Sequence, residues 1–225
     1  MTKQELLKTA KPIKFTTDMV HAILREQNPK TQTRRPIEPQ PDNECQEFAG
    51  LFDCNEVSNR KAVHITEAKF INDSRPPEYC FRKPRYKVGD VLYVRETWAN
   101  HYYDQFGMLN VSEKVLYKAD GEYTHMVWKS STTMPKEAAR LFLRVTDVRV
   151  EQLNDVTVEN IEKEGFYCDP MPDYGGVGGY KMGMKIHFTK YIHRKYGNGE
   201  CIKGYNPWLW AYEFERIVTG TEDEV

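Results

Sequence analysis

Apolar and polar residues alternate in several short runs along the chain, a pattern typical of β-strands. The alternation is clearest over residues 91–98, 140–150 and 207–217. Two shorter runs, 11–15 and 116–119, also predict strands. The strands are well separated in the sequence, so they predict a sheet built from distant parts of the chain.

Helical periodicity is confined to short segments. Met19, Val20, Ile23 and Leu24 share one face of a predicted helix, and Pro29 forces that helix to end by the residue before it. Separated strands with a few short helices predict an α+β fold on a small, strongly twisted sheet or barrel.

Two more helices are expected nearer the C-terminus. Thr157 is a suitable N-cap for one, and Gly165 is its expected C′ residue. Residues 185–196 predict a basic helix whose aromatic residues are interleaved with lysine and arginine. This interleaving is typical of surfaces that bind single-stranded nucleic acid, but a solvated helix face looks much the same. The lysine-rich residues 1–11 are expected to fray.

Other parts of the chain show no clear period. Residues 38–87 are rich in proline and predict a long irregular insertion, and the glycine-rich residues 173–184 predict a flexible loop without a phosphate-loop signature. The acidic residues 218–225 are expected to be disordered. We therefore predict a single domain over residues 11–217.

Composition limits the function classes. The 32 Lys and Arg residues nearly balance the 33 Asp and Glu residues, so nucleic-acid binding would need local basic patches. The five cysteines are odd in number and irregularly spaced, which favours a reducing compartment. With neither a membrane span nor a signal peptide expected, we predict a cytoplasmic protein. The spacing of Cys45, Cys54, His64 and Cys80 matches no zinc motif, and we expect no metal or cofactor.

Residues 28–35, Asn-Pro-Lys-Thr-Gln-Thr-Arg-Arg, concentrate polar chemistry directly after the first long helix. A lysine, two threonine hydroxyls and two arginines fall within six consecutive positions. The segment is too polar for an ordinary core. It predicts either a functional segment lining a cleft or a solvated basic loop.

Taken together, these motifs resemble the ASCH domain family, a branch of the PUA-like β-barrels that is frequent in phage and prophage genomes. The matching segments run in family order and cover roughly half of residues 11–217. They are Lys30–Arg35, Gly89–Trp98, Tyr117–Gly121, Met134–Arg140, Val145–Gly165, Asn206–Trp210 and Phe214–Glu215.

The resemblance implies a barrel with a cleft lined by the first of these segments. The family pattern is Gly-x-Lys-x-x-Glu-x-Arg. Lys30 and Arg35 match it, whereas Asn28 replaces the usual glycine and Thr33 the usual glutamate. The threonine version is similar to the small ASCH amidohydrolases that cleave N4-acetylcytidine, which implies a catalytic set of Lys30, Thr33 and Glu164.

Amide hydrolysis needs a nucleophile, a group that removes its proton and donors for the developing oxyanion. Thr33 is the expected nucleophile. Lys30 acts as the base only if its pKa is lowered, and otherwise stabilises charge. Glu164 precedes a helix-ending glycine, where the helix dipole disfavours a carboxylate and would raise its pKa toward acid/base use. An exposed glutamate in an acidic helix is the plainer alternative.

A second group of residues is expected to bind a ligand, which would be a nucleoside or single-stranded nucleic acid. Trp98 would stack on a base or be a core aromatic residue. No membrane contact is expected. The predicted binding residues are Arg34, Arg35, Arg95, Trp98 and Lys118.

Three functions remain open from the sequence. The first is a hydrolase of a modified nucleobase or nucleoside, an N-acylated cytidine-like amide. The second is a non-catalytic PUA-like reader of RNA or modified DNA. The third is an ASCH-type ribonuclease.

Overall fold

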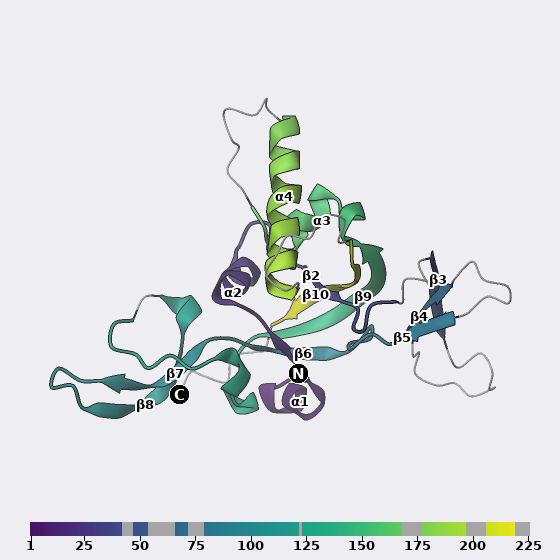
Figure 1. Ribbon diagram of the computed structural model, residues 1–225. Coiled ribbons are helices and arrows are strands. Elements are labelled where there is room, and N and C mark those ends of the chain that lie inside the picture. The colour runs from purple at the N-terminus through teal and green to yellow at the C-terminus, as the bar shows by residue number, and fades with distance from the viewer. Residues whose placement is uncertain are drawn as a thin grey trace. The chain divides into compact units, whose positions relative to one another are not determined.

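The computed structural model describes residues 1–41, 47–53, 66–71, 79–121, 123–167, 177–196 and 206–218 (Figure 1). The helices are α1 (Lys3–Thr9), α2 (Thr17–Leu24), α3 (Val158–Lys163) and α4 (Val177–Tyr196). The strands are β1 (Lys11–Lys14), β2 (Gln32–Pro36), β3 (Glu47–Asp53), β4 (Thr66–Ile71), β5 (Tyr79–Arg82), β6 (Val91–Arg95), β7 (Trp98–Tyr103), β8 (Leu109–Tyr117), β9 (Phe142–Gln152) and β10 (Trp208–Ile217).

The predicted α+β class is confirmed. The main sheet has five strands in the order β1-β6-β9-β10-β2. It is mixed, because β1 pairs with β6 in parallel whereas β6 pairs with β9, and β10 with β2, antiparallel. Over the described residues the strands form no closed barrel.

The chain divides into two compact units, and the division falls within β9 and β10. The prediction of one domain over residues 11–217 stays a prediction. The first unit comprises Met1–Lys30, Gly89–Val145 and Phe214–Val225, and the second Thr31–Val88 and Thr146–Glu213.

In the first unit, the chain begins with an ordered helix rather than the expected frayed end. Thr2 and Glu5 form a capping box: the Thr2 hydroxyl accepts from the Glu5 N–H at 3.3 Å, and the Glu5 carboxylate accepts from the Thr2 N–H at 2.9 Å. Leu6 is fully buried in a cluster with Trp98, Met134 and Phe142. Burial of this single leucine fixes α1.

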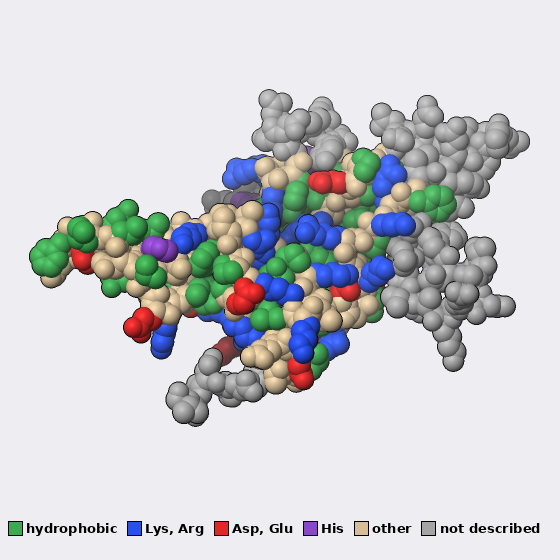
Figure 2. All heavy atoms as spheres, turned by 90° about the horizontal axis from the view of Figure 1, so that it is seen from below, with side chains coloured by type: hydrophobic (Ala, Val, Ile, Leu, Met, Phe, Trp, Pro, Cys, Tyr) green, Lys and Arg blue, Asp and Glu red, His purple; other side chains and the backbone are tan. Residues whose placement is uncertain are grey.

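Also in the first unit, the strand predicted over residues 91–98 is interrupted. β6 ends at Arg95 and β7 begins at Trp98. Glu96, which lies between the two strands, is buried against Arg140, and residues 96 and 97 belong to neither strand. β7 then forms a hairpin with β8, and Figure 2 shows hydrophobic side chains gathered at the hairpin's end. The exposed ones are Tyr103, Phe106, Met108, Leu109 and Val111.

In the second unit, α3 and α4 lie side by side (Figure 1). Thr157 caps α3 as predicted, and Gly165 follows it with a φ of 89°. α4 includes the predicted basic helix but begins at Val177, within the stretch predicted as a flexible loop. Leu153, Ile161, Phe188 and other apolar residues form the hydrophobic cluster beneath the two helices.

The segment predicted as an irregular insertion also belongs to the second unit. It contains β3, β4 and β5, which form an antiparallel sheet in that order. The pairing of β3 with β4 shifts register between Phe48 and Gly50, and such a bulge disrupts the alternation that identifies a strand. Cys45, Cys54 and His64 lie outside the described residues, as do 173–176 and 219–225.

Across the part of the chain that the structure describes, no helix combines the length and apolar character needed to cross a membrane.

Candidate active site

The polar segment singled out from the sequence is exposed at Asn28 and Pro29 but buried at Lys30 and from Gln32 to Arg34, so it is not a solvated loop as a whole. Gln32, Thr33 and Arg34, the first residues of β2, have exposed fractions of 0%. Burying polar groups costs free energy unless each is hydrogen-bonded, and burying charges costs more. The described residues contain seven such buried polar or charged side chains: Lys30, Gln32, Thr33, Arg34, Glu96, Glu164 and His193.

Arg34 is bonded within the second unit through its whole guanidinium group. Nε donates to Glu151 at 2.9 Å, and Nη2 donates to the Gln32 amide oxygen at 3.1 Å. Nη1 donates to the Asn160 carbonyl at 3.2 Å and to Glu164 Oε2 at 3.0 Å. The sequence predicted a ligand contact for Arg34, but these bonds favour a positioning role. A ligand could reach Arg34 only by replacing one of these partners.

Glu164 reaches this segment from 130 residues further along the chain. It caps the C-terminus of α3, and its exposed fraction is 2%. Its Oε1 accepts from the Arg34 backbone N–H at 3.0 Å, in addition to the ion pair through Oε2. These two donors stabilise the negative charge of the carboxylate. Glu164 therefore lies against the Thr33–Arg34 peptide as an ion-paired group.

Thr33 and Arg35 interact directly. Arg35 Nη1 donates to Thr33 Oγ1 and to the Arg34 carbonyl, each at 2.9 Å. A cationic donor on the threonine oxygen stabilises negative charge there. Arg35 is half-buried, whereas Thr33 and Arg34 are both fully buried.

Tyr196, the last residue of α4, belongs to the same cluster. Burial raises the pKa of its phenol, the positive charge of Arg35 opposes that rise and the negative charge of Glu164 adds to it. The sequence placed Tyr196 in a basic helix and gave no signal that it would approach Arg35 and Glu164.

Tyr212 lies opposite Thr33 in the β2–β10 ladder and gives a test of this part of the sheet. Its buried phenol accepts from the Arg85 N–H at 3.1 Å, and burial raises its pKa from 10.0 to about 12. Unfolding releases the phenol to its ordinary pKa, so its contribution to stability is complete below pH 10 and is lost between pH 10 and 12.

We expect wild type to lose about 2–3 kcal/mol of unfolding free energy over this range relative to Tyr212→Phe. Urea denaturation of both proteins from pH 8 to pH 12 measures the difference. A constant difference at all pH values would contradict the burial of an ionisable group at this position.

Lys30 is the last residue of the first unit and is also buried, with an exposed fraction of 2%. Its backbone N–H donates to the Ala22 carbonyl at 2.8 Å, and its ammonium group lies 5.6 Å from the centroid of the Phe15 ring. Two residues before it, Asn28 has a φ of 48°. This left-handed conformation favours glycine, but asparagine adopts it more readily than most residues. Asparagine at position 28 is thus compatible with a turn that usually contains glycine.

Two of the predicted binding residues lie where β6 and β7 meet in the first unit. Trp98 has an exposed fraction of 6% and packs in the hydrophobic cluster around Leu6, which leaves little of its ring for a base. Arg95 is half-buried and donates to the Thr132 carbonyl through Nη2. The geometry favours the core alternative for Trp98.

Lys118, the third predicted binding residue of the first unit, is exposed. It begins the short 3-10 helix η1 (Lys118–Asp120) and lines a cavity of about 560 Å³.

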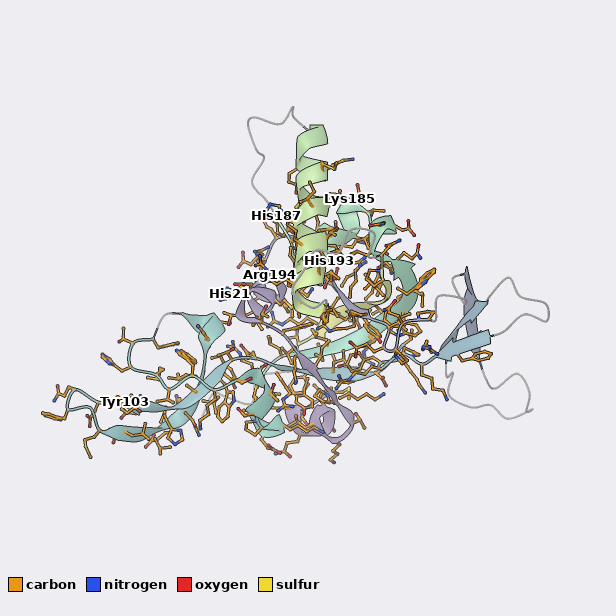
Figure 3. All side chains as sticks on the ribbon, in the orientation of Figure 1. His21, Tyr103, Lys185, His187, His193 and Arg194 are labelled. Carbon is orange, nitrogen blue, oxygen red and sulfur yellow. The ribbon has the colours of Figure 1, made fainter. Side chains whose placement is uncertain are left out.

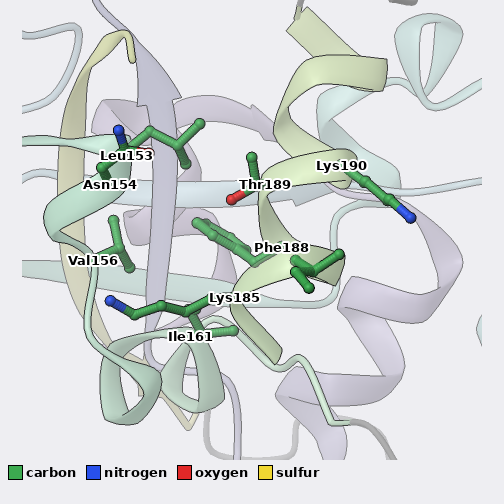
Figure 4. A pocket seen from close by; sticks show the side chains of 9 residues that line it. Leu153, Asn154, Val156, Ile161, Lys185, Phe188, Thr189 and Lys190 are labelled. Carbon is green, nitrogen blue, oxygen red and sulfur yellow. The ribbon is translucent and has the colours of Figure 1, made fainter. Parts of the chain in front are cut away.

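A smaller pocket of about 270 Å³ lies in the second unit beside α4 (Figure 4). Leu153, Val156 and Phe188 make it largely apolar, and Lys185 extends along one side while Lys190 points away. α4 contains no Asp or Glu, and Figure 3 shows Lys185, His187 and Arg194 along it.

No group of three or more His, Cys, Asp or Glu side chains that could hold a metal ion occurs within the described ranges. The chain matches no model of a known protein family, no curated protein and no solved structure.

Proposed function

We propose that this protein is a hydrolase that removes an acyl group from a modified nucleobase or nucleoside, an N-acylated cytidine-like amide. One observation carries the proposal. Glu164 hydrogen-bonds the backbone N–H of Arg34, so a carboxylate from a distant helix is held beside the Thr33–Arg34 peptide. The resemblance of the Lys30–Arg35 motif to the ASCH amidohydrolases, and with it a PUA-like fold, supports this assignment.

The chemistry is a two-step acyl transfer. The Thr33 oxygen attacks the amide carbonyl, its proton passes to a base, and the exocyclic amine leaves with a proton. Water then hydrolyses the acyl-threonine ester. Arg35, which donates to Thr33 Oγ1 at 2.9 Å, stabilises negative charge on that oxygen. Glu164 is the expected proton shuttle, and Lys30 the base or charge stabiliser.

Access to the nucleophile is the main requirement of this proposal. Thr33 has an exposed fraction of 0% in the absence of a ligand. It lies on β2, the last strand in the sheet order, and among the described strands β10 is its one neighbour in the sheet. Substrate binding must therefore displace side chains that cover this edge strand.

The test is to incubate the protein with N4-acetylcytidine and related N-acylated nucleosides and to detect the deacylated product by mass spectrometry. We expect Thr33→Val, which keeps the side-chain shape, to lower kcat/KM at least a thousandfold, on the order of what loss of a nucleophile costs. Lys30→Ala should have a comparable effect.

Thr31→Val is the matched control, because Thr31 lies in the same segment. Its backbone N–H donates to the Lys163 carbonyl, and this bond does not depend on the side chain that the variant changes. Its activity should stay within a few-fold of wild type. Absence of turnover by wild type, or full turnover by Lys30→Ala, would exclude the hydrolase.

A non-catalytic reader of RNA or modified DNA is the second candidate, favoured by α4. This 20-residue helix carries exposed Lys181, Lys185, Lys190, Arg194 and Lys195 and no acidic residue. If α4 binds a strand backbone, the affinity for a single-stranded oligonucleotide should fall steeply with salt. Lack of binding at low salt would exclude the reader. Intact RNA after incubation would exclude the ribonuclease.

A further inference from the structure

The cavity of about 560 Å³ in the first unit takes no part in the proposed hydrolase chemistry. α2 and the segment from η1 to Trp128 form its walls, and its volume lies within the range of about 300–1,000 Å³ typical of small-molecule sites. The residues important for its chemistry are Thr17, His21, Lys118, Asp120, Tyr123 and Trp128.

Two aromatic residues form one side of the cavity. The ring centroids of Tyr123 and Trp128 are 6.2 Å apart and their planes are inclined by 51°, so the rings do not stack on each other. Tyr123 has an exposed fraction of 39%, and Trp128 is half-buried. A planar ring is the ligand group that best uses such a surface.

Among the described residues that line the cavity, Lys118 is the lysine whose charge can face a ligand. Asp120 lies 2.5 Å from Arg140, and the same guanidinium group pairs with Glu96 at 2.9 Å. Both acidic groups are therefore engaged by Arg140, whose single positive charge offsets one of their two negative charges. Lys118 is exposed and forms no ion pair with any other residue that the structure describes. Its ammonium group is available for an anionic group on the ligand.

His21 supplies a directional polar group from α2 (Figure 3). Its Nε2 lies 2.9 Å from the Ala119 carbonyl oxygen. Because a carbonyl oxygen can only accept, Nε2 carries the hydrogen, and Nδ1 of the neutral ring is then an acceptor. Such an acceptor complements the amino or imino N–H on the edge of a nucleobase.

We propose that this cavity is a second binding site, for a nucleoside monophosphate. The base packs against Trp128 and Tyr123, its polar edge donates to His21, and the phosphate pairs with Lys118. An aliphatic acid would leave the aromatic wall unused, and an uncharged heterocycle would leave Lys118 without a partner. This site is independent of the proposed hydrolase and does not require Thr33.

Titration of the full-length protein with CMP, AMP, cytidine and inorganic phosphate tests the proposal, with tryptophan fluorescence and calorimetry as the readouts. We expect saturable binding of a monophosphate. Trp128→Leu should weaken it about ten- to hundredfold, as expected when one stacking partner is lost. Lys118→Ala should weaken the monophosphate about tenfold but leave cytidine unchanged.

Lys114→Ala is the matched control, since Lys114 is an exposed lysine on β8 and does not line the cavity; it should bind as wild type does. If Trp128→Leu fails to fold, Tyr123→Ala replaces it. Thr33→Val should bind the monophosphate normally, which separates this site from the hydrolase. The proposal is overturned if no monophosphate binds at millimolar concentration, if the cavity variants bind as tightly as wild type, or if inorganic phosphate binds as tightly as CMP.

Discussion

Replacing Arg34 by methionine should lower the free energy of unfolding by about 3–5 kcal/mol, the usual cost of removing one partner from a buried ion pair. Methionine retains the apolar stem but removes every donor, together with the guanidinium carbon that lies 5.8 Å from the centroid of the Phe188 ring. Glu164, with an exposed fraction of 2%, would then lose its ion pair with the side chain of residue 34. It would keep the hydrogen bond from the backbone N–H of that residue. Urea denaturation at pH 7 measures the loss.

Two comparisons show whether the loss comes from the buried charge. In the double variant Arg34→Met with Glu164→Met, no carboxylate remains at position 164, and we expect it to be more stable than Arg34→Met alone. Arg144→Met is the exposed control: Arg144 lies 3.6 Å from Glu215, both are largely exposed, and the loss should stay within about 1 kcal/mol. A loss within about 1 kcal/mol for Arg34→Met itself would show that the pair is not buried in solution.

The part of the candidate site that the sequence predicted is its local chemistry. Lys30, Thr33 and Arg35 belong to one motif, and the resemblance to the ASCH family placed Glu164 at the end of a short helix whose bounds Thr157 and Gly165 predict. Thr157 accepts the N–H of Asn160, and Gly165 adopts a φ of 89°, as those signals require. Caps and turns depend on a few neighbouring residues, so their signals survive in a single sequence.

The role of Arg34 could not be predicted, because it depends on partners far away in the sequence. Glu151, Asn160 and Glu164 lie 117–130 residues from Arg34. Only the pairing of β2 with other elements decides that its guanidinium group points inward. From the sequence, two adjacent arginines look equivalent, but in the structure Arg34 is fully buried and Arg35 is half-buried.

The strands that were missed share a different cause. β3 carries a bulge, and β8, of which only the end was predicted as a strand over residues 116–119, alternates residues that are mostly exposed or half-buried, so neither shows a clear apolar period. β7 begins at the end of the segment, residues 91–98, that was predicted as one strand. The residue that interrupts this segment, Glu96, is buried but polar. Hydrophobic patterning identifies β1, β6, β9 and β10 of the main sheet, but not β2, whose buried residues Gln32, Thr33 and Arg34 are polar.

Arg140 is the second position where one substitution should have a large effect. It pairs with Glu96 through Nε and Nη2, each at 2.9 Å, with Asp120 through Nη1, and lies 3.9 Å from the centroid of the Tyr117 ring. Glu96 has an exposed fraction of 1%. Arg140→Met should lower the free energy of unfolding by about 3–5 kcal/mol at pH 7, because it leaves a buried carboxylate without its cation.

The pH dependence distinguishes this cause from lost packing. Burial raises the pKa of Glu96 above its ordinary 4.5, and Arg140 opposes that rise, so the pKa must rise further in the variant. A raised folded-state pKa favours the protonated carboxyl, so its stabilising effect is complete below pH 4.5 and is lost as pH rises through the folded pKa.

The deficit of Arg140→Met should therefore shrink from pH 7 to pH 4, and adding Glu96→Gln should reduce it at pH 7. Asp120→Asn, which alters only the more exposed partner, should cost about 1 kcal/mol or less. An equal deficit at both pH values would mean that Arg140 stabilises the first unit through packing on Tyr117 rather than through its charge.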